Sequence, residues 1–139
     1  MANIFTALQN QKRIKTEMAY TIGFIDKYEV IVNDRDSDHE PHLHIQLYDN
    51  DKNVVFETRI SLIEADYYDD KDLRLPNKQI VDAFDNFMRS NYSSDDLEGV
   101  IIATNWAYCV NQWNHSKDNM PKIIKGTKIP NYRNLKFAK

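Results

Sequence analysis

Three of the four histidines in the chain lie close together, at a spacing that suits metal binding. They are His39, His42 and His44. Alternate residues of a strand point to the same face, so we expect the rings of His42 and His44 side by side, with His39 reaching them from the preceding loop. Neutral imidazoles and nearby carboxylates together bind Zn²⁺, Mn²⁺ or Fe²⁺. The segment therefore predicts a divalent-metal site, against the alternative that the two strand histidines make hydrogen bonds within the fold.

A metal-dependent hydrolase or nuclease built on these histidines also needs a general base and a group that stabilises developing charge. Glu40 or Glu57 would supply the base, and Arg35 or Arg59 the cation. Their spacing does not require this arrangement. We therefore expect a protein without enzymatic activity and without a cofactor, and keep the metal-dependent enzyme as the alternative.

Charge is distributed unevenly along the chain, although the formal net charge is only −3. Residues 26–72 carry −9 and residues 116–139 carry +6, whereas residues 1–25 carry +2 and residues 73–115 carry −2. One interpretation is an ordinary solvated surface. The other is a bipolar surface, in which the acidic segment 26–72 binds a host protein or nucleoprotein complex and the basic tail contacts nucleic-acid phosphates.

Acidic and aromatic residues in two predicted loops are the expected partner-binding residues. One loop precedes the histidine strand and carries three aspartates, and the other places two tyrosines among aspartates. Loops carry recognition residues more often than the elements that they connect. The expected contact residues are Asp34, Asp36, Asp38, Asp66, Tyr67, Tyr68, Asp69 and Asp70.

Four segments rich in β-branched and aromatic residues predict an antiparallel meander. Asp26 and Lys27 form a tight turn between the first two, and the polar cluster 49–53 forms a turn between the last two. A sheet of about four strands is of ordinary size for a small domain. The expected strands are 20–25, 28–32, 42–48 and 54–60.

The apolar period changes after Pro76 and predicts two helices. Asn77 is placed to cap the first helix, and Thr104 or Asn105 begins the second. Each helix then has one apolar face. These faces comprise Ile80, Val81, Phe84, Phe87 and Met88 in the first helix, and Trp106, Cys109, Val110 and Trp113 in the second.

The pattern as a whole predicts a single α+β domain over residues 1–139. An antiparallel meander of about four strands (19–62) is packed on one face by two helices (77–115), which gives a two-layer core. Residues 1–18 are expected to form an arm or a short helix. Residues 116–139 are expected to form an irregular, extended, basic tail, because proline and glycine interrupt every pattern there.

Composition excludes several classes of protein. A single cysteine, Cys109, allows neither an intramolecular disulfide nor a cysteine-based zinc site. Residues 1–14 have no apolar run long enough for a signal peptide or a membrane span. None of the 3 glycines forms a phosphate-binding loop. We expect a soluble cytoplasmic protein that does not associate with membranes.

Residues 38–45 read Asp-His-Glu-Pro-His-Leu-His-Ile, and Leu75-Pro76 and Asn105-Trp106 stand at the starts of the predicted helices. This pattern resembles a family of small bacterial and phage domains of unknown function whose signature strand is Asp-His-x-Pro-Pro-His-Phe-His. The likeness covers roughly residues 20–135. It is closer to longer variants from phages and mobile elements that end in a Met-Pro-Asp-Tyr-like segment, here Ile-Pro-Asn-Tyr at 129–132. The resemblance implies a host-interaction role of anti-defence or inhibitor type, or a component of a toxin–antitoxin pair.

Overall fold

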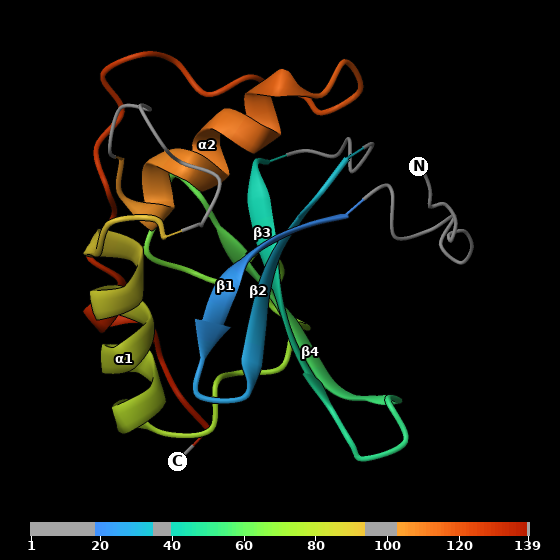
Figure 1. Ribbon diagram of the computed structural model, residues 1–139. Coiled ribbons are helices and arrows are strands. Elements are labelled where there is room, and N and C mark those ends of the chain that lie inside the picture. Colours follow the sequence, from blue (N-terminus) through green and yellow to red (C-terminus); the bar gives the residue numbers. More distant parts are fainter. Residues whose placement is uncertain (1–18, 35–39, 94–102, 139) are drawn as a thin grey trace.

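The computed structural model describes residues 19–34, 40–93 and 103–138, which form one four-stranded antiparallel sheet and two α-helices (Figure 1). The predicted α+β fold class is confirmed. The strand order is that of a meander, because each strand pairs with its neighbour in sequence. The short helix expected in residues 1–18 lies outside the described residues. The strands are β1 (Ala19–Ile25), β2 (Tyr28–Asn33), β3 (His42–Tyr48) and β4 (Val54–Ser61).

Two tight turns set the register of the sheet. Between β1 and β2, Asp26 adopts a φ of 56°, a left-handed conformation that aspartate tolerates better than most residues. Between β3 and β4, the Asp49 carboxylate accepts hydrogen bonds from the backbone N–H groups of Asp51 and Asn53, each at 2.9 Å. Both turns lie where the polar residues predict them.

Both helices begin at the expected caps. In α1 (Lys78–Arg89), the Asn77 side chain accepts a hydrogen bond from the backbone N–H of Ile80 at 2.9 Å. In α2 (Asn105–His115), Thr104 Oγ1 accepts one from Ala107 at 3.0 Å. These bonds satisfy backbone donors that a helix leaves unpaired in its first turn. The two helices lie on the same side of the sheet (Figure 1).

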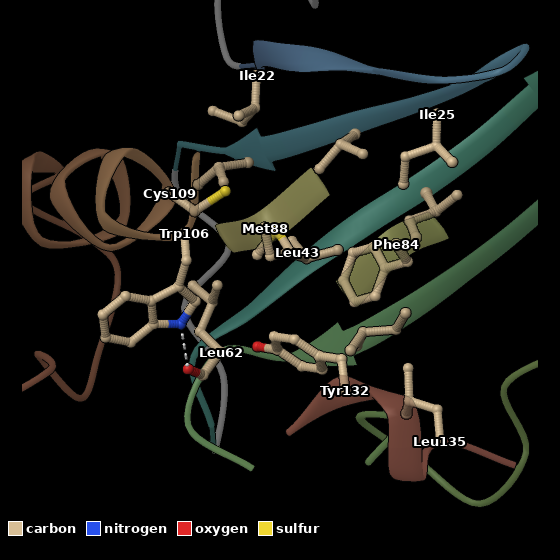
Figure 2. Close-up of a cluster of buried hydrophobic side chains, with 14 of the residues drawn as sticks. Ile22, Ile25, Leu43, Leu62, Phe84, Met88, Trp106, Cys109, Tyr132 and Leu135 are labelled. Carbon is tan, nitrogen blue, oxygen red and sulfur yellow. Dashed lines mark hydrogen bonds between the residues drawn. The ribbon is translucent and has the colours of Figure 1, made fainter. Parts of the chain in front are cut away.

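The hydrophobic core fills the space between this side of the sheet and the helices (Figure 2). Leu43 and Ile45 of β3 are fully buried there, as are Phe84 and Met88 of α1. Helix α1 approaches β1 so closely that a Cβ atom at Gly23 would lie 2.9 Å from the ring of Phe87. The absence of a side chain at position 23 therefore allows the helix to pack against the strand.

Two hydrogen bonds from aromatic side chains tie the end of β4 to the rest of the core. Trp106 Nε1 donates to the carbonyl oxygen of Leu62 at 3.0 Å (Figure 2), and the Tyr132 hydroxyl donates to that of Ser61 at 2.7 Å. Both aromatic side chains are buried, so the bonds satisfy polar atoms that have no access to bulk water.

The described part of the tail, residues 116–138, is irregular as predicted, apart from the 3₁₀ helix η2 (Tyr132–Asn134). It nevertheless belongs to the core, because Ile123, Tyr132 and Leu135 are buried. The tail passes along the helix side of the sheet (Figure 1). Within the described ranges, no helix has the length and apolar character needed to cross a bilayer.

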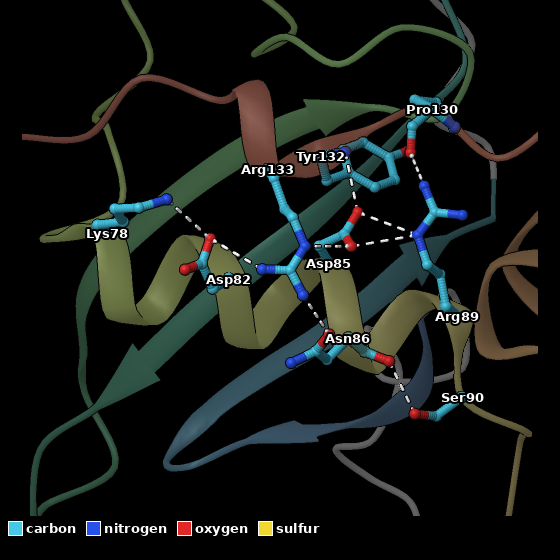
Figure 3. Close-up of polar contacts among 9 residues, drawn as sticks. All are labelled: Lys78, Asp82, Asp85, Asn86, Arg89, Ser90, Pro130, Tyr132 and Arg133. Atoms are coloured by element: carbon cyan, nitrogen blue, oxygen red, sulfur yellow. Dashed lines mark hydrogen bonds and ion pairs between the residues drawn. The ribbon is translucent and has the colours of Figure 1, made fainter.

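A buried carboxylate fastens this tail to α1 (Figure 3). Asp85 Oδ2 lies 3.1 Å from Arg89 Nε and 3.3 Å from Arg133 Nε, and Asp85 Oδ1 accepts a hydrogen bond from the backbone N–H of Tyr132 at 3.0 Å. Asp82 adds a second contact to Arg133 at 3.4 Å. We call these five residues the tail clasp.

Candidate functional site

The side of the sheet opposite the helices carries a group of polar residues. Leu43 and Ile45 point into the core, so the residues that alternate with them, His44 and Gln46, point to the opposite side. Residues directly paired across strands share a side. Gln46 pairs with Glu29 and with Glu57, and His44 pairs with Arg59. We call Glu29, His44, Gln46, Glu57 and Arg59 the polar face.

Hydrogen bonds link the side chains of the polar face into a chain. His44 Nδ1 lies 3.0 Å from Glu57 Oε2, and Gln46 Nε2 donates to the same oxygen at 3.0 Å. The Tyr48 hydroxyl in turn donates to Gln46 Oε1 at 2.6 Å. These hydrogen bonds therefore fix the position of the Tyr48 ring as well as that of the Glu57 carboxylate.

Negative charge gathers around Tyr48. Partial burial, followed by the neighbouring carboxylates of Glu29 and Glu57, raises the pKa of Tyr48 to about 12. A nearby carboxylate disfavours the phenolate because like charges repel. This end of the polar face therefore has a negative electrostatic potential.

His42 is packed inside the protein rather than presented to solvent. Its side chain is 1% exposed, and its Nδ1 atom lies 2.9 Å from the carbonyl oxygen of Glu40. The ring centroid lies 4.3 Å from that of Tyr68 and 5.4 Å from that of Trp113. These contacts make His42 part of an aromatic cluster with Tyr68 and Trp113.

The structure brings together two of the three histidines predicted to bind metal. The ring centroids of His42 and His44 lie 5.2 Å apart. The third predicted ligand, His39, lies outside the described residues. In the ranges that the structure does describe, no three histidine, cysteine, aspartate or glutamate side chains are grouped so that they could hold a metal ion. The three-histidine site therefore stays a prediction.

A hollow of about 310 Å³ opens beside His44 and is lined by His44, Glu57, Arg59 and Asp72. We call it the histidine hollow. Arg59 Nε donates to Asp72 Oδ1 at 2.9 Å, and the Arg59 guanidinium lies 4.5 Å from the centroid of the Tyr68 ring. In this hollow, His44 thus faces the carboxylate of Glu57, and Arg59 faces that of Asp72.

The residues expected to act with the histidines as base and cation are partly assembled. Glu57 and Arg59 both line the histidine hollow. The Glu40 carboxylate instead accepts a hydrogen bond from the Ser61 hydroxyl. Arg35 lies outside the described residues.

The two tyrosines predicted to contact a partner hold their loop in place. The Tyr67 hydroxyl donates to the carbonyl oxygen of Lys136 and accepts a hydrogen bond from the backbone N–H of Leu75 at 3.0 Å. The ring of Tyr68 packs against His42 and Arg59. Both tyrosines therefore contribute to the fold of this loop.

The predicted acidic contact residues differ in their exposure. The three aspartates that flank the tyrosines are exposed, and Asp34 is half-buried just after β2. Asp36 and Asp38 lie outside the described residues. Of the contact residues predicted in this loop, Asp66, Asp69 and Asp70 are exposed, whereas Tyr67 and Tyr68 are half-buried.

A second hollow, of about 540 Å³, lies at the turn end of the sheet and was not predicted from the sequence. Phe24 and Tyr48 contribute aromatic rings that are 58% and 39% exposed. The alternation of His44, Gln46 and Tyr48 along β3 indicates that Tyr48 lies on the same side of the sheet as His44. The positions of Phe24 and Glu29 beside it depend on the register of β1 and β2, which the sequence does not show. We call this hollow the turn pocket. It is lined by Phe24, Glu29, Tyr48, Asp49, Asn50 and Lys52.

Comparison of this chain with protein-family models, curated proteins and solved structures gave no match. The family resemblance of residues 38–45 therefore stays a prediction. Function has to be inferred from the polar face and from the charges around it.

Proposed function

We propose that the protein is a non-enzymatic interaction protein that binds a basic partner through its acidic segment, residues 26–72. The partner is a cationic surface of a host protein or nucleoprotein complex, and binding inhibits it, as the resemblance to phage and mobile-element domains implies. The observation that carries the proposal is the charge of this segment, in which 14 acidic residues stand against 5 basic ones.

The fold supports the proposal because it concentrates part of this charge on one surface. Glu29 and Glu57 lie in the same cross-strand row of the polar face, with Gln46 between them. The described tail, in contrast, follows the helix side (Figure 1). Complementary potentials of this kind accelerate encounter with a partner of opposite charge and reject partners of like charge.

The carboxylates of the polar face are also held in position before any partner arrives. The Thr21 hydroxyl donates to Glu29, and Gln46 donates to Glu57. Groups that are already ordered lose less conformational entropy when they bind. Fixed carboxylates are therefore better suited to recognition than mobile surface side chains.

A capture experiment with matched variants tests the proposal. Immobilised wild-type protein is compared with the double variant Glu29→Gln/Glu57→Gln in bacterial lysate, and captured proteins are quantified by mass spectrometry. The control, Asp82→Asn/Asp118→Asn, removes the same formal charge outside the acidic segment. We expect partners that bind the wild type and the control, leave at high salt and do not bind the polar-face variant. Equal capture by all three proteins would refute the proposal.

One observation favours a metal-dependent hydrolase as a second candidate. The pair of His44 and Glu57 has the form of a histidine oriented by a carboxylate, an arrangement common to metal ligands and general bases. Metal analysis of protein purified without chelators separates the two functions. If the protein is only an interaction protein, the wild type and His44→Ala should contain the same trace amount of metal. A stoichiometric metal that His44→Ala loses would support the hydrolase.

A further inference from the structure

We infer that the turn pocket receives an arginine side chain of the partner. This inference rests on the proposed function, because it specifies one contact that a basic partner makes with the acidic segment and its neighbouring strand. It follows from three properties of the pocket: its exposed aromatic rings, the sign of its charge, and the fixed position of its groups.

The first property is the presence of two exposed aromatic rings at a concave site. Phe24 comes from β1 and Tyr48 from β3, and Glu29 of β2 is the direct strand partner of Phe24. Phe24 is 58% exposed, so folding buries less than half of its surface. Aromatic side chains exposed beside a hollow are typical of binding sites, and their faces attract cations.

The second property is the negative charge. Glu29 and Asp49 contribute carboxylates, and Lys52 is the one cation among the described residues that line the pocket. Glu57 lies close enough to act on the hydroxyl of Tyr48 at the pocket wall. The pocket therefore favours a ligand group that carries positive charge.

The third property is preorganisation. The chain of hydrogen bonds from Tyr48 through Gln46 to Glu57 holds the Tyr48 ring, and the hydroxyl of Thr21 holds Glu29. A ring and a carboxylate at fixed positions suit a planar guanidinium, which stacks on an aromatic face and forms paired hydrogen bonds with a carboxylate. An ammonium group does not offer both contacts in the same plane, so the pocket selects arginine over lysine.

Fluorescence anisotropy with two labelled probes, hexa-arginine and hexa-lysine, tests the inference on the full chain at low salt. The two peptides carry the same charge, so a difference between them reports guanidinium recognition. We expect the wild type to bind hexa-arginine about fivefold more tightly than hexa-lysine, because a guanidinium stacks on the ring and pairs with the carboxylate at the same time, whereas an ammonium does not.

Variants assign this preference to the turn pocket. Phe24→Ala is expected to lower the affinity for hexa-arginine by about threefold or more and to reduce the preference over hexa-lysine. Tyr48→Phe keeps the ring but removes the hydroxyl bond to Gln46 that holds it, so it is expected to weaken the preference less than Phe24→Ala does. The matched controls are Leu73→Ala, which changes an apolar residue that is 57% exposed elsewhere, and Glu64→Gln, which removes an exposed carboxylate outside the pocket. Both are expected to behave as the wild type.

The backbone amide resonances of the wild type give a second measurement that does not depend on whether variants fold. Titration with hexa-arginine is expected to shift the amide resonances of Phe24 and Tyr48 more than those of Glu64 and Leu73. Shifts confined to the loop at 64–72 would overturn the inference.

The outcomes separate the pocket from the proposed function. Equal affinity for both probes, with Phe24→Ala unchanged, overturns the arginine pocket. If salt-sensitive binding then disappears on neutralising Asp66, Asp69 and Asp70, the proposed function still stands. Absence of binding to either probe at low salt counts against both.

Discussion

Two carboxylates, Asp85 in the tail clasp and Glu57 on the polar face, illustrate opposite uses of the same chemistry. Asp85 accepts hydrogen bonds from the Arg89 side chain and from the backbone N–H of Tyr132 (Figure 3), and Glu57 accepts them from side chains of β3. The side chain of Asp85 is 3% exposed and that of Glu57 is 44% exposed. Burial thus decides whether such a group holds the fold together or remains accessible to another molecule.

The two networks also differ in the charges that surround their carboxylates. In the tail clasp, Arg89 and Arg133 neutralise Asp85 and join a helix to a distant part of the chain. Around Tyr48, the carboxylates of Glu29 and Glu57 act together, and their charges disfavour the phenolate. We therefore expect substitutions in the clasp to change stability, and substitutions on the polar face to change binding.

The largest expected effect is that of Asp85→Ala. Removal of this buried carboxylate takes one acceptor from the backbone N–H of Tyr132 and the buried anion from two arginines. Arg89 keeps its hydrogen bond to Pro130, and Arg133 keeps its contact with Asp82. The arginine side chains are 44% and 45% exposed and can turn toward water, so we expect a loss of about 3 kcal/mol in the free energy of unfolding, the lower end for a broken buried ion pair. Urea denaturation measures it.

The control for this prediction is Asp82→Ala, on the same helix and also in contact with Arg133. Its side chain is 30% exposed, so the expected loss is below about 1 kcal/mol. Equal losses for Asp82→Ala and Asp85→Ala would show that burial does not distinguish these carboxylates.

A smaller effect is expected for Tyr132→Phe, which removes only the hydroxyl. This hydroxyl donates to the carbonyl oxygen of Ser61 at 2.7 Å in the core, and the substitution removes this buried hydrogen bond. We expect unfolding to become easier by about 1–2 kcal/mol. Thermal and urea denaturation together measure the change. A variant as stable as the wild type would show that this hydrogen bond does not stabilise the fold.

Glu57→Gln is expected to change binding more than stability, the reverse of the substitutions in the tail clasp. Because the carboxylate is 44% exposed, its removal should change the free energy of unfolding by less than about 1 kcal/mol. Binding to a basic partner should weaken, since one of the carboxylates of the polar face is neutralised. Denaturation and anisotropy on the same preparation make the comparison. Large destabilisation without a change in binding would assign Glu57 to the fold.

The smallest expected effect concerns alkaline pH. The pKa of Tyr48 is about 12 in the folded protein and near 10 in the unfolded chain. The unfolded chain therefore loses this proton first, and the contribution of Tyr48 to stability is intact below pH 10 and is lost as the pH rises toward 12. Burial also raises the pKa of Tyr67 and Tyr132. The difference in stability between wild type and Tyr48→Phe isolates Tyr48, and should shrink over this range. A constant difference would contradict the assignment.

Local sequence patterns were sufficient to predict the elements of the fold. The caps at Asn77 and Thr104 and the turn at Asp26 each depend on neighbouring residues, and the structure has them where the pattern predicts. The same period of two along β3 correctly placed the rings of His42 and His44 side by side.

The remaining features depend on contacts between distant segments, which a local pattern does not contain. Asp85 interrupts the apolar stripe of α1, and only the arrival of Arg133 from the tail explains its burial. The meeting of Glu57 with His44 depends on the register of β3 against β4. In the same way, the turn pocket exists because three strands bring Phe24, Glu29 and Tyr48 together.

The most direct test of the account is the salt dependence of hexa-arginine binding to the wild type and to Glu29→Gln/Glu57→Gln. Raising the salt from about 0.01 M to about 1 M shortens the Debye length from ~30 Å to ~3 Å. If the polar face binds a cationic partner, the wild type binds tightly at low salt and loses affinity steeply, whereas the double variant binds weakly throughout. Identical curves for the two proteins would contradict the claim that this face is the binding surface.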